Sequence, residues 1–190
     1  FKKDILNLVY ISDYYGLNEV SKYWEQVIEI NDWQKKRLNH IILDKLFGTI
    51  SGKKIAILGF AFKANTNDTR ESPAISVCQG LMEEGAKLSI YDPKVTEGSI
   101  NEEFKTYGDK HSKNFKKWEF SQSIEETCKD SDAIIILTEW EEFRCISWDR
   151  ISDLMRKPSW LFDTRAIANS SEARKNNINT WVIGKGVNIN

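Results

Sequence analysis

The first fifty residues carry apolar side chains at helical spacing. Ile5, Leu8 and Val9 form a short stripe that stops near Gly16, a residue type that commonly ends helices. A second pattern covers residues 18–47, which is about twice the usual length of a helix. We expect so long a helix to pack on more than one neighbour, either as a core or linker helix or as a dimer-forming helix.

After Gly52 the pattern changes to short apolar runs, which are typical of strands buried on both faces of a parallel sheet. The expected strands lie at residues 53–59, 87–92, 118–120, 132–138, 160–163 and 181–184. Helices are expected at residues 72–84, 123–129 and 143–155. Ser72 suits the N-cap of the first of these helices, and Pro73 suits its first position. Residues 93–117 are polar and without a pattern, which predicts a surface loop.

The alternation of strands and helices indicates βαβ units. The expected fold class is α/β, a Rossmann-like doubly wound parallel sheet preceded by a long helical segment. We therefore divide the chain into a central helical dimerisation segment at residues 1–50 and an α/β domain at residues 51–190.

The composition narrows the classes of function. Apolar residues make up 41% and charged residues 29% of the chain, as in globular proteins and unlike disordered ones. The net charge of −1 argues against a nucleic-acid partner, and no apolar run reaches the ~20 residues of a membrane-spanning helix. The three cysteines are scattered without zinc spacing, so we expect no metal and a reducing, cytoplasmic location.

The segment from Ile55 to Asp92 has the outline of a dinucleotide-binding unit but departs from it in detail. The usual G-x-G-x-x-G is replaced by Gly59-Phe-Ala-Phe-Lys-Ala, and Asp92 follows Gly59 by 33 residues rather than by about 20. An insertion, residues 63–71, separates the strand from its helix. We therefore expect that this unit does not hold NAD in the ordinary way.

Two cationic side chains, Lys63 and Arg165, come just after expected strands. Nucleotides bind at the carboxyl ends of strands in such sheets, where arginine contacts a diphosphate through two hydrogen bonds and lysine acts as a point charge. The alternative is that both are solvated cations on loops.

Longer blocks of sequence carry a resemblance to a known family. Residues 62–73 match F-K-x-x-T-x-D-x-R-x-S-P at every fixed position, and this signature resembles that of the nucleotide-sugar dehydrogenases. Tyr91-Asp-Pro93, Thr138-Glu-Trp140 and Phe162-Asp-x-Arg165 are similar to further blocks of that family. The sequence Asn31-Asp-Trp-Gln-Lys-Lys-Arg37 most resembles that of the animal members of the family, which act on UDP-glucose.

The resemblance implies an enzyme that oxidises UDP-glucose to UDP-glucuronate, with NAD as cofactor and a cysteine thioester as intermediate. Sister enzymes acting on UDP-N-acetylmannosamine or GDP-mannose, and a non-catalytic nucleotide-binding or dimerisation module, remain alternatives. The family's nucleophilic cysteine would stand just before Phe1, and its NAD-binding domain would precede that. We therefore expect a piece of a longer enzyme that binds UDP and is inactive alone.

The resemblance also implies roles for six residues. Asp4 matches an aspartate that activates the hydrolytic water, with an acid favoured by the helix dipole as the alternative. Lys3 and Arg70 match residues that contact NAD. Phe62 and Lys63 match substrate contacts, and Arg165 matches an arginine on the UDP part. The alternative for Arg70 is an ion pair with Asp68 that orders the loop. The long helix would form a homodimer, or part of a higher oligomer.

Overall fold

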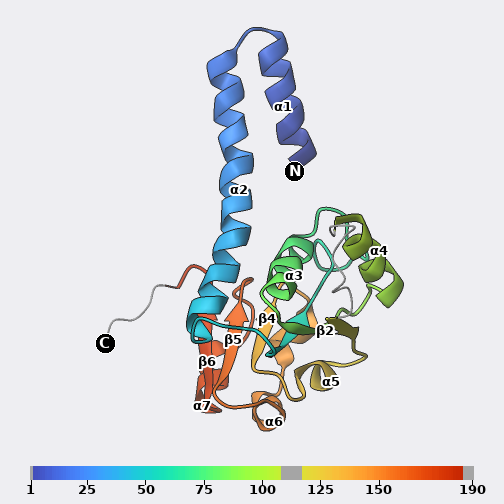
Figure 1. Cartoon of the computed structure of the whole chain (residues 1–190), viewed down its shortest axis with the longest axis vertical. Helices are drawn as coiled ribbons and strands as arrows, with labels where there is room; N and C mark the ends of the chain where they lie inside the picture. Colours follow the sequence, from blue (N-terminus) through green and yellow to red (C-terminus); the bar gives the residue numbers. More distant parts are fainter. Residues whose placement is uncertain (1, 108–116, 186–190) are drawn as a thin grey trace. The chain divides into compact units, whose positions relative to one another are not determined.

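The structure is a computed structural model that describes residues 2–107 and 117–185. The chain forms two compact units that divide between Ile41 and Ile42, inside the long second helix. Figure 1 shows the course of each unit.

Unit 1 is a pair of helices, α1 (Lys2–Tyr14) and the larger part of α2 (Asn18–Lys45). The turn between them closes when the Leu17 N–H donates to the Ser12 carbonyl at 2.9 Å, around Gly16 with its positive φ of 71°. Of residues 2–41, only the small Ser12 and Ser21 are buried. Unit 1 therefore has almost no apolar core of its own.

Unit 2 contains a six-stranded parallel sheet in the order β3-β2-β1-β4-β5-β6. The strands are β1 (Lys54–Leu58), β2 (Lys87–Tyr91), β3 (Trp118–Phe120), β4 (Ala133–Ile136), β5 (Ser159–Asp163) and β6 (Ile178–Val182). All four residues of the central strand β4 are fully buried, because helices cover both faces of the sheet. This confirms the doubly wound parallel sheet.

The helices that connect the strands of unit 2 fall into two groups, and within each group successive helices contact each other. The first group comprises α3 (Pro73–Glu83) and α4 (Glu97–Tyr107). The second comprises α5 (Ile124–Cys128), α6 (Trp148–Leu154) and α7 (Ser170–Lys175). Right-handed crossovers from a central pair of strands toward both edges place two such groups on opposite faces.

Two local predictions are confirmed. Ser72 caps α3, with Pro73 at the first helical position, and Ser123 caps α5 by accepting a hydrogen bond from the Glu126 N–H. Two others are wrong. The expected loop at 93–117 contains α4, in which Ile100 and Phe104 are buried although the residues between them along the chain are polar. Residues 108–116 of that prediction lie outside the described part of the chain.

The helix expected at 143–155 is interrupted. A 3₁₀ turn, η1 (Glu141–Cys145), comes first, and α6 begins only after Ile146 and Ser147 adopt extended backbone. The break allows both Phe143 and Trp148 to be fully buried. Among the described residues, no helix is both long and apolar enough to cross a membrane.

Candidate functional site

The strand order places a topological switch point between β1 and β4. The chain continues from β1 toward β2 on one side and from β4 toward β5 on the other. Ligands of open α/β sheets bind in the crevice beyond the carboxyl ends of such strands. We call the segments at the carboxyl ends of β1, β2, β4 and β5 the carboxyl edge; they are residues 59–63, 92–95, 137–140 and 163–166.

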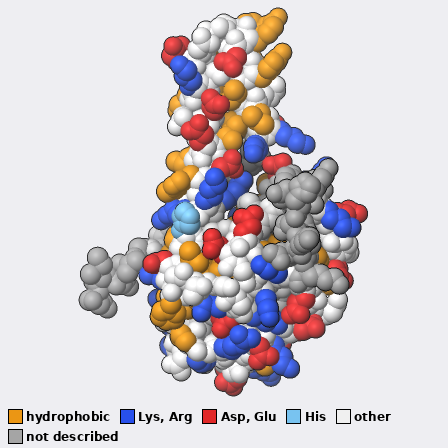
Figure 2. All heavy atoms as spheres, viewed as in Figure 1, with side chains coloured by type: hydrophobic (Ala, Val, Ile, Leu, Met, Phe, Trp, Pro, Cys, Tyr) orange, Lys and Arg blue, Asp and Glu red, His pale blue; other side chains and the backbone are white. Residues whose placement is uncertain are grey.

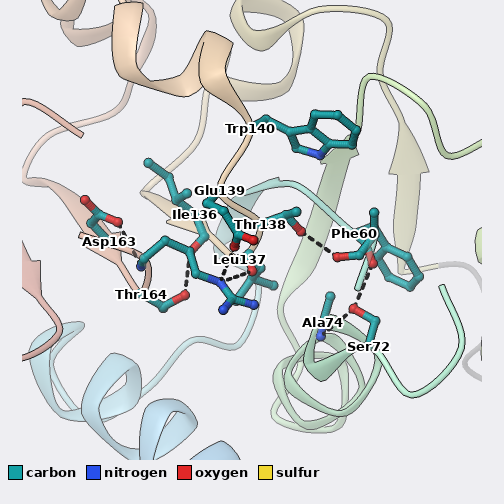
Figure 3. A network of polar contacts seen from close by, with 12 residues as sticks. Phe60, Ser72, Ala74, Ile136, Leu137, Thr138, Glu139, Trp140, Asp163 and Thr164 are labelled. Carbon is teal, nitrogen blue, oxygen red and sulfur yellow. Dashed lines mark hydrogen bonds and ion pairs between the residues drawn. The ribbon is translucent and has the colours of Figure 1, made fainter. Parts of the chain in front are cut away.

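The first of these segments is held close to the third. Gly59 has a φ of +91°, and a Cβ at this position would lie 2.5 Å from Thr138 Cβ. Thr138 Oγ1 donates to the Ala61 carbonyl at 2.7 Å, and Ser72 Oγ donates to the Phe60 carbonyl at 2.8 Å (Figure 3). The backbone after β1 is therefore fixed from both sides.

Asp92, directly after β2, is the most connected side chain of the carboxyl edge. Its Oδ2 accepts hydrogen bonds from Phe60 N at 2.7 Å, Ala61 N at 3.0 Å and Trp140 Nε1 at 3.1 Å. Its Oδ1 accepts from the backbone N–H groups of Lys94 and Val95 at 2.9 and 3.0 Å. Asp92 is only 3% exposed, so one buried carboxylate joins three of the four segments.

Arg165 is anchored on one side of its guanidinium. Its Nε donates to the Leu137 carbonyl at 2.7 Å and lies 3.3 Å from Glu139 Oε2 (Figure 3). The contact with Glu139 is ionic, because the single Nε–H already points at Leu137. The Arg165 N–H in turn donates to Asp163 Oδ1 at 3.0 Å. The side chain stays 32% exposed, and its contacts with Leu137 and Glu139 both involve Nε.

Phe62 and Lys63 are exposed at the start of the insertion between β1 and α3. The Phe62 N–H donates to the Asp68 carbonyl at 2.8 Å, which closes the loop on itself. Thr138 ties this loop to the exit of β4, as Arg165 ties the exit of β5 to the same segment. The structure therefore gathers Phe62, Lys63 and Arg165 at one edge of the sheet.

Arg70, in the same loop, forms a two-point contact with Asp68 and remains 80% exposed. Its Nε and a terminal nitrogen lie 2.9 and 2.8 Å from the two carboxylate oxygens. This hydrogen bond, together with the charge of Asp68, raises the pKa of Arg70. The ion pair named as the alternative for Arg70 is thus present, while a contact with NAD stays a prediction.

Lys3 and Asp4 belong to unit 1, where both are exposed in the first turn of α1. Their roles by resemblance stay predictions.

A tyrosine and a glutamate border the carboxyl edge near the end of β2. Tyr91 donates its phenolic hydrogen to Glu142 Oε2 at 3.4 Å. Burial, and then the charge of Glu142, raise the pKa of Tyr91 to about 12, so the phenol stays neutral. Burial also raises the pKa of Glu142. In the described part of the chain, no three His, Cys, Asp or Glu side chains gather as a metal site would require.

The residues of the carboxyl edge do not fit NAD as a dinucleotide fold holds it. In that fold an acid at the end of the second strand bonds a ribose hydroxyl. A carboxylate has about four lone-pair positions, and Asp92 already accepts five hydrogen bonds from its own chain. We therefore derive no cofactor chemistry from unit 2.

Asp92, Thr138 and Asp163 lie in the family-like sequence blocks, but the sequence predicted no role for these three residues. Each one hydrogen-bonds backbone groups that hold a loop of the carboxyl edge. Their positions could have indicated this role, because polar side chains at the ends of buried strands need hydrogen-bond partners at that end of the sheet.

Comparisons with known proteins agree with this geometry. Residues 56–170 match the model of the UDP-glucose/GDP-mannose dehydrogenase family, UDP binding domain. The chain is 45% identical to UDP-glucose 6-dehydrogenase 4 of Arabidopsis thaliana and 46% identical to UDP-glucose 6-dehydrogenase 1 of Glycine max, over 97% of its length in each case. It covers 41% of each relative. Because these are plant proteins, the animal-type resemblance stays a prediction.

A solved structure shows the same fold. A UDP-glucose dehydrogenase from Pyrobaculum islandicum superposes with a TM-score of 0.68 and 22% identity, covering 94% of this chain and 35% of that one. The family match spans more than half of the chain and includes the whole switch point between β1 and β4. The chain therefore belongs to the UDP-glucose/GDP-mannose dehydrogenase family and contains its UDP binding domain.

Proposed function

We propose that the chain is the UDP-binding and dimer-forming part of an NAD-dependent dehydrogenase that oxidises UDP-glucose to UDP-glucuronate. The chain spans about two fifths of the length of its curated relatives, so the activity belongs to the longer protein. The observation that carries the proposal is Arg165, which is anchored at the switch point through Nε while its side chain stays 32% exposed.

The proposed ligand contacts follow from the charges and positions at the carboxyl edge. Arg165 offers parallel N–H donors to a diphosphate, and Lys63 adds a mobile positive charge from the opposite side of the switch point. Phe62, at 36% exposure, offers an apolar contact. Glu139 beside Arg165 keeps the guanidinium in place when no ligand is bound.

The roles of the remaining residues rest on the family resemblance. Lys3 and Arg70 would contact NAD that is held mainly by other parts of the complete protein, and Asp4 would serve thioester hydrolysis. By the family resemblance, none of Cys78, Cys128 and Cys145 lies in a motif that matches the nucleophile's. Burial raises the pKa of Cys78 and of Cys128, so neither thiol is a good nucleophile. The three free cysteines support a reducing, cytoplasmic location.

Replacing Arg165 or Lys63 by alanine should weaken UDP binding by the 190-residue chain. Each variant loses charge-assisted hydrogen bonds, which contribute roughly 1.5–3 kcal/mol, or about 10- to 150-fold in the dissociation constant. Calorimetric titration with UDP measures the change directly.

The matched control is Arg156→Ala, because Arg156 pairs with Asp132 at the opposite end of β4. This variant should bind UDP as the parent does. If Arg165→Ala and Lys63→Ala also bind UDP like the parent, both residues are solvated loop cations and the proposed site is wrong.

The proposed dimer rests on the surface of α2. Val20, Tyr23, Val27 and Ile30 recur with a heptad spacing of three and four residues, and all four are exposed. Figure 2 shows hydrophobic side chains spread over the helices of unit 1. An apolar heptad seam of this kind is typical of helices that pair with another helix. A second copy of α2 supplies such a partner by two-fold symmetry.

The double variant Val27→Glu, Ile30→Glu should convert the dimer to a monomer, because it places four carboxylates in one apolar seam. Light scattering at a fixed protein concentration measures the mass. Lys22→Glu changes the net charge equally on an exposed polar position and should leave the dimer intact. A monomeric parent, or a double variant that stays dimeric, contradicts this interface.

A further inference from the structure

Asp92 accepts more hydrogen bonds from its own chain than the other acidic residues of the carboxyl edge, Glu139 and Asp163. Three N–H donors meet at Oδ2 and two at Oδ1, all between 2.7 and 3.1 Å. A buried carboxylate in this position is stable only because these donors replace water. No oxygen lone pair of Asp92 is left for a ligand.

The donors come from three separate segments of the edge. Phe60 and Ala61 precede the proposed ligand residues Phe62 and Lys63, so Asp92 sets where that loop leaves β1. Trp140 follows Glu139, which contacts Arg165. Asp92 is therefore linked through the chain to each of the proposed UDP contacts without touching any of them.

We propose that Asp92 is the positioning residue of the nucleotide site, having lost the ribose-reading role of the corresponding acid in dinucleotide-binding folds. The inference rests on the proposed function, because it concerns the affinity of the same site for UDP. It predicts that the acid acts only through the loops it holds, and that it does not distinguish the hydroxyl groups of a bound ribose.

The variant Asp92→Asn tests this directly. The amide keeps the shape but presents an NH₂ group toward N–H donors, so one set of loop contacts must break. We expect the dissociation constant for UDP to rise about tenfold or more in protein that circular dichroism shows to be folded. The affinity for 2′-deoxy-UDP should fall by the same factor, because Asp92 does not contact the ribose.

A matched control separates positioning from stability. Asp132 also accepts a backbone hydrogen bond between strands, from Lys54 N at 2.8 Å, but it lies at the opposite end of β4. Asp132→Asn should lower the melting temperature and leave the affinity of the folded protein for UDP unchanged. Asp92→Asn is therefore expected to lower both the affinity for UDP and the melting temperature, whereas Asp132→Asn is expected to lower only the melting temperature.

A milder variant covers the case in which Asp92→Asn does not fold. Trp140→Phe removes one of the five donors and keeps an aromatic ring in the core, and it should raise the dissociation constant for UDP about threefold. An unchanged affinity in folded Asp92→Asn, or in Trp140→Phe where the first variant does not fold, overturns the proposal. So does a loss of affinity for UDP that 2′-deoxy-UDP does not share. A parent that binds no UDP instead refutes the proposed function and, with it, this inference.

Discussion

Gly59→Ala should destabilise unit 2 by roughly 2–5 kcal/mol, since it combines a left-handed backbone with an overpacked contact. Gly59 has a φ of +91°, and the new methyl carbon would lie 2.5 Å from Thr138 Cβ and 2.8 Å from Thr138 N. The ends of β1 and β4 must then separate, which also breaks the bond from Thr138 to Ala61. Thermal unfolding should show a melting temperature lower by about 5–15 °C.

Gly52→Ala is the control for the backbone contribution. Gly52 has a φ of +76°, but its Cβ would meet nothing within 4 Å. It should therefore show only the smaller backbone cost of about 1–2 kcal/mol. If the two variants melt at the same temperature, the close approach between Gly59 and Thr138 does not hold the switch point together.

Asp4→Asn in the complete protein should slow hydrolysis of the thioester by roughly 10²- to 10⁴-fold, which is the usual contribution of a general base. In the proposed reaction, water attacks the thioester carbonyl, gives its proton to the carboxylate and releases the cysteine thiolate. Asparagine keeps the shape but cannot take that proton. A covalent adduct between substrate and enzyme should accumulate, and mass spectrometry of the intact protein detects it.

Asp13→Asn, at an exposed position on the same helix, should leave turnover unchanged. A normal rate in Asp4→Asn would mean that Asp4 only complements the dipole of α1, which is worth about 0.3–1 kcal/mol of stability and nothing in catalysis. A variant that is slow but forms no adduct would place Asp4 in an earlier step than hydrolysis.

The elements that the sequence predicted correctly are those with a local physical cause. The strands β1 and β4 are continuous apolar runs because both of their faces are buried, and Ser72 with Pro73 is a local signal for a helix start. The helix α4 was missed because, over residues 97–105, Ile100 and Phe104 are its only buried positions and the residues between them are polar. The break before α6 follows from the burial of both Phe143 and Trp148, which depends on the tertiary fold.

The residues of the candidate site likewise include some that the sequence alone could identify and one that it could not. Lys63 and Arg165 could be found because they follow apolar runs directly. The function of Asp92 could not, because its partners Phe60 and Trp140 lie 32 and 48 residues away along the chain. Only the parallel pairing of β1 with β2 and β4 brings these three segments together.

We propose that this chain carries a UDP site at the carboxyl edge of a dinucleotide-type sheet, in which Asp92 is not available to bond a ribose. Calorimetric titration of the 190-residue chain with UDP, and separately with ADP-ribose, tests it most directly. We expect saturable binding of one UDP per chain and weaker binding of ADP-ribose, which shares the diphosphate but finds Asp92 already occupied by its own chain. A chain that binds ADP-ribose as tightly as UDP, or that binds no UDP, would contradict the account.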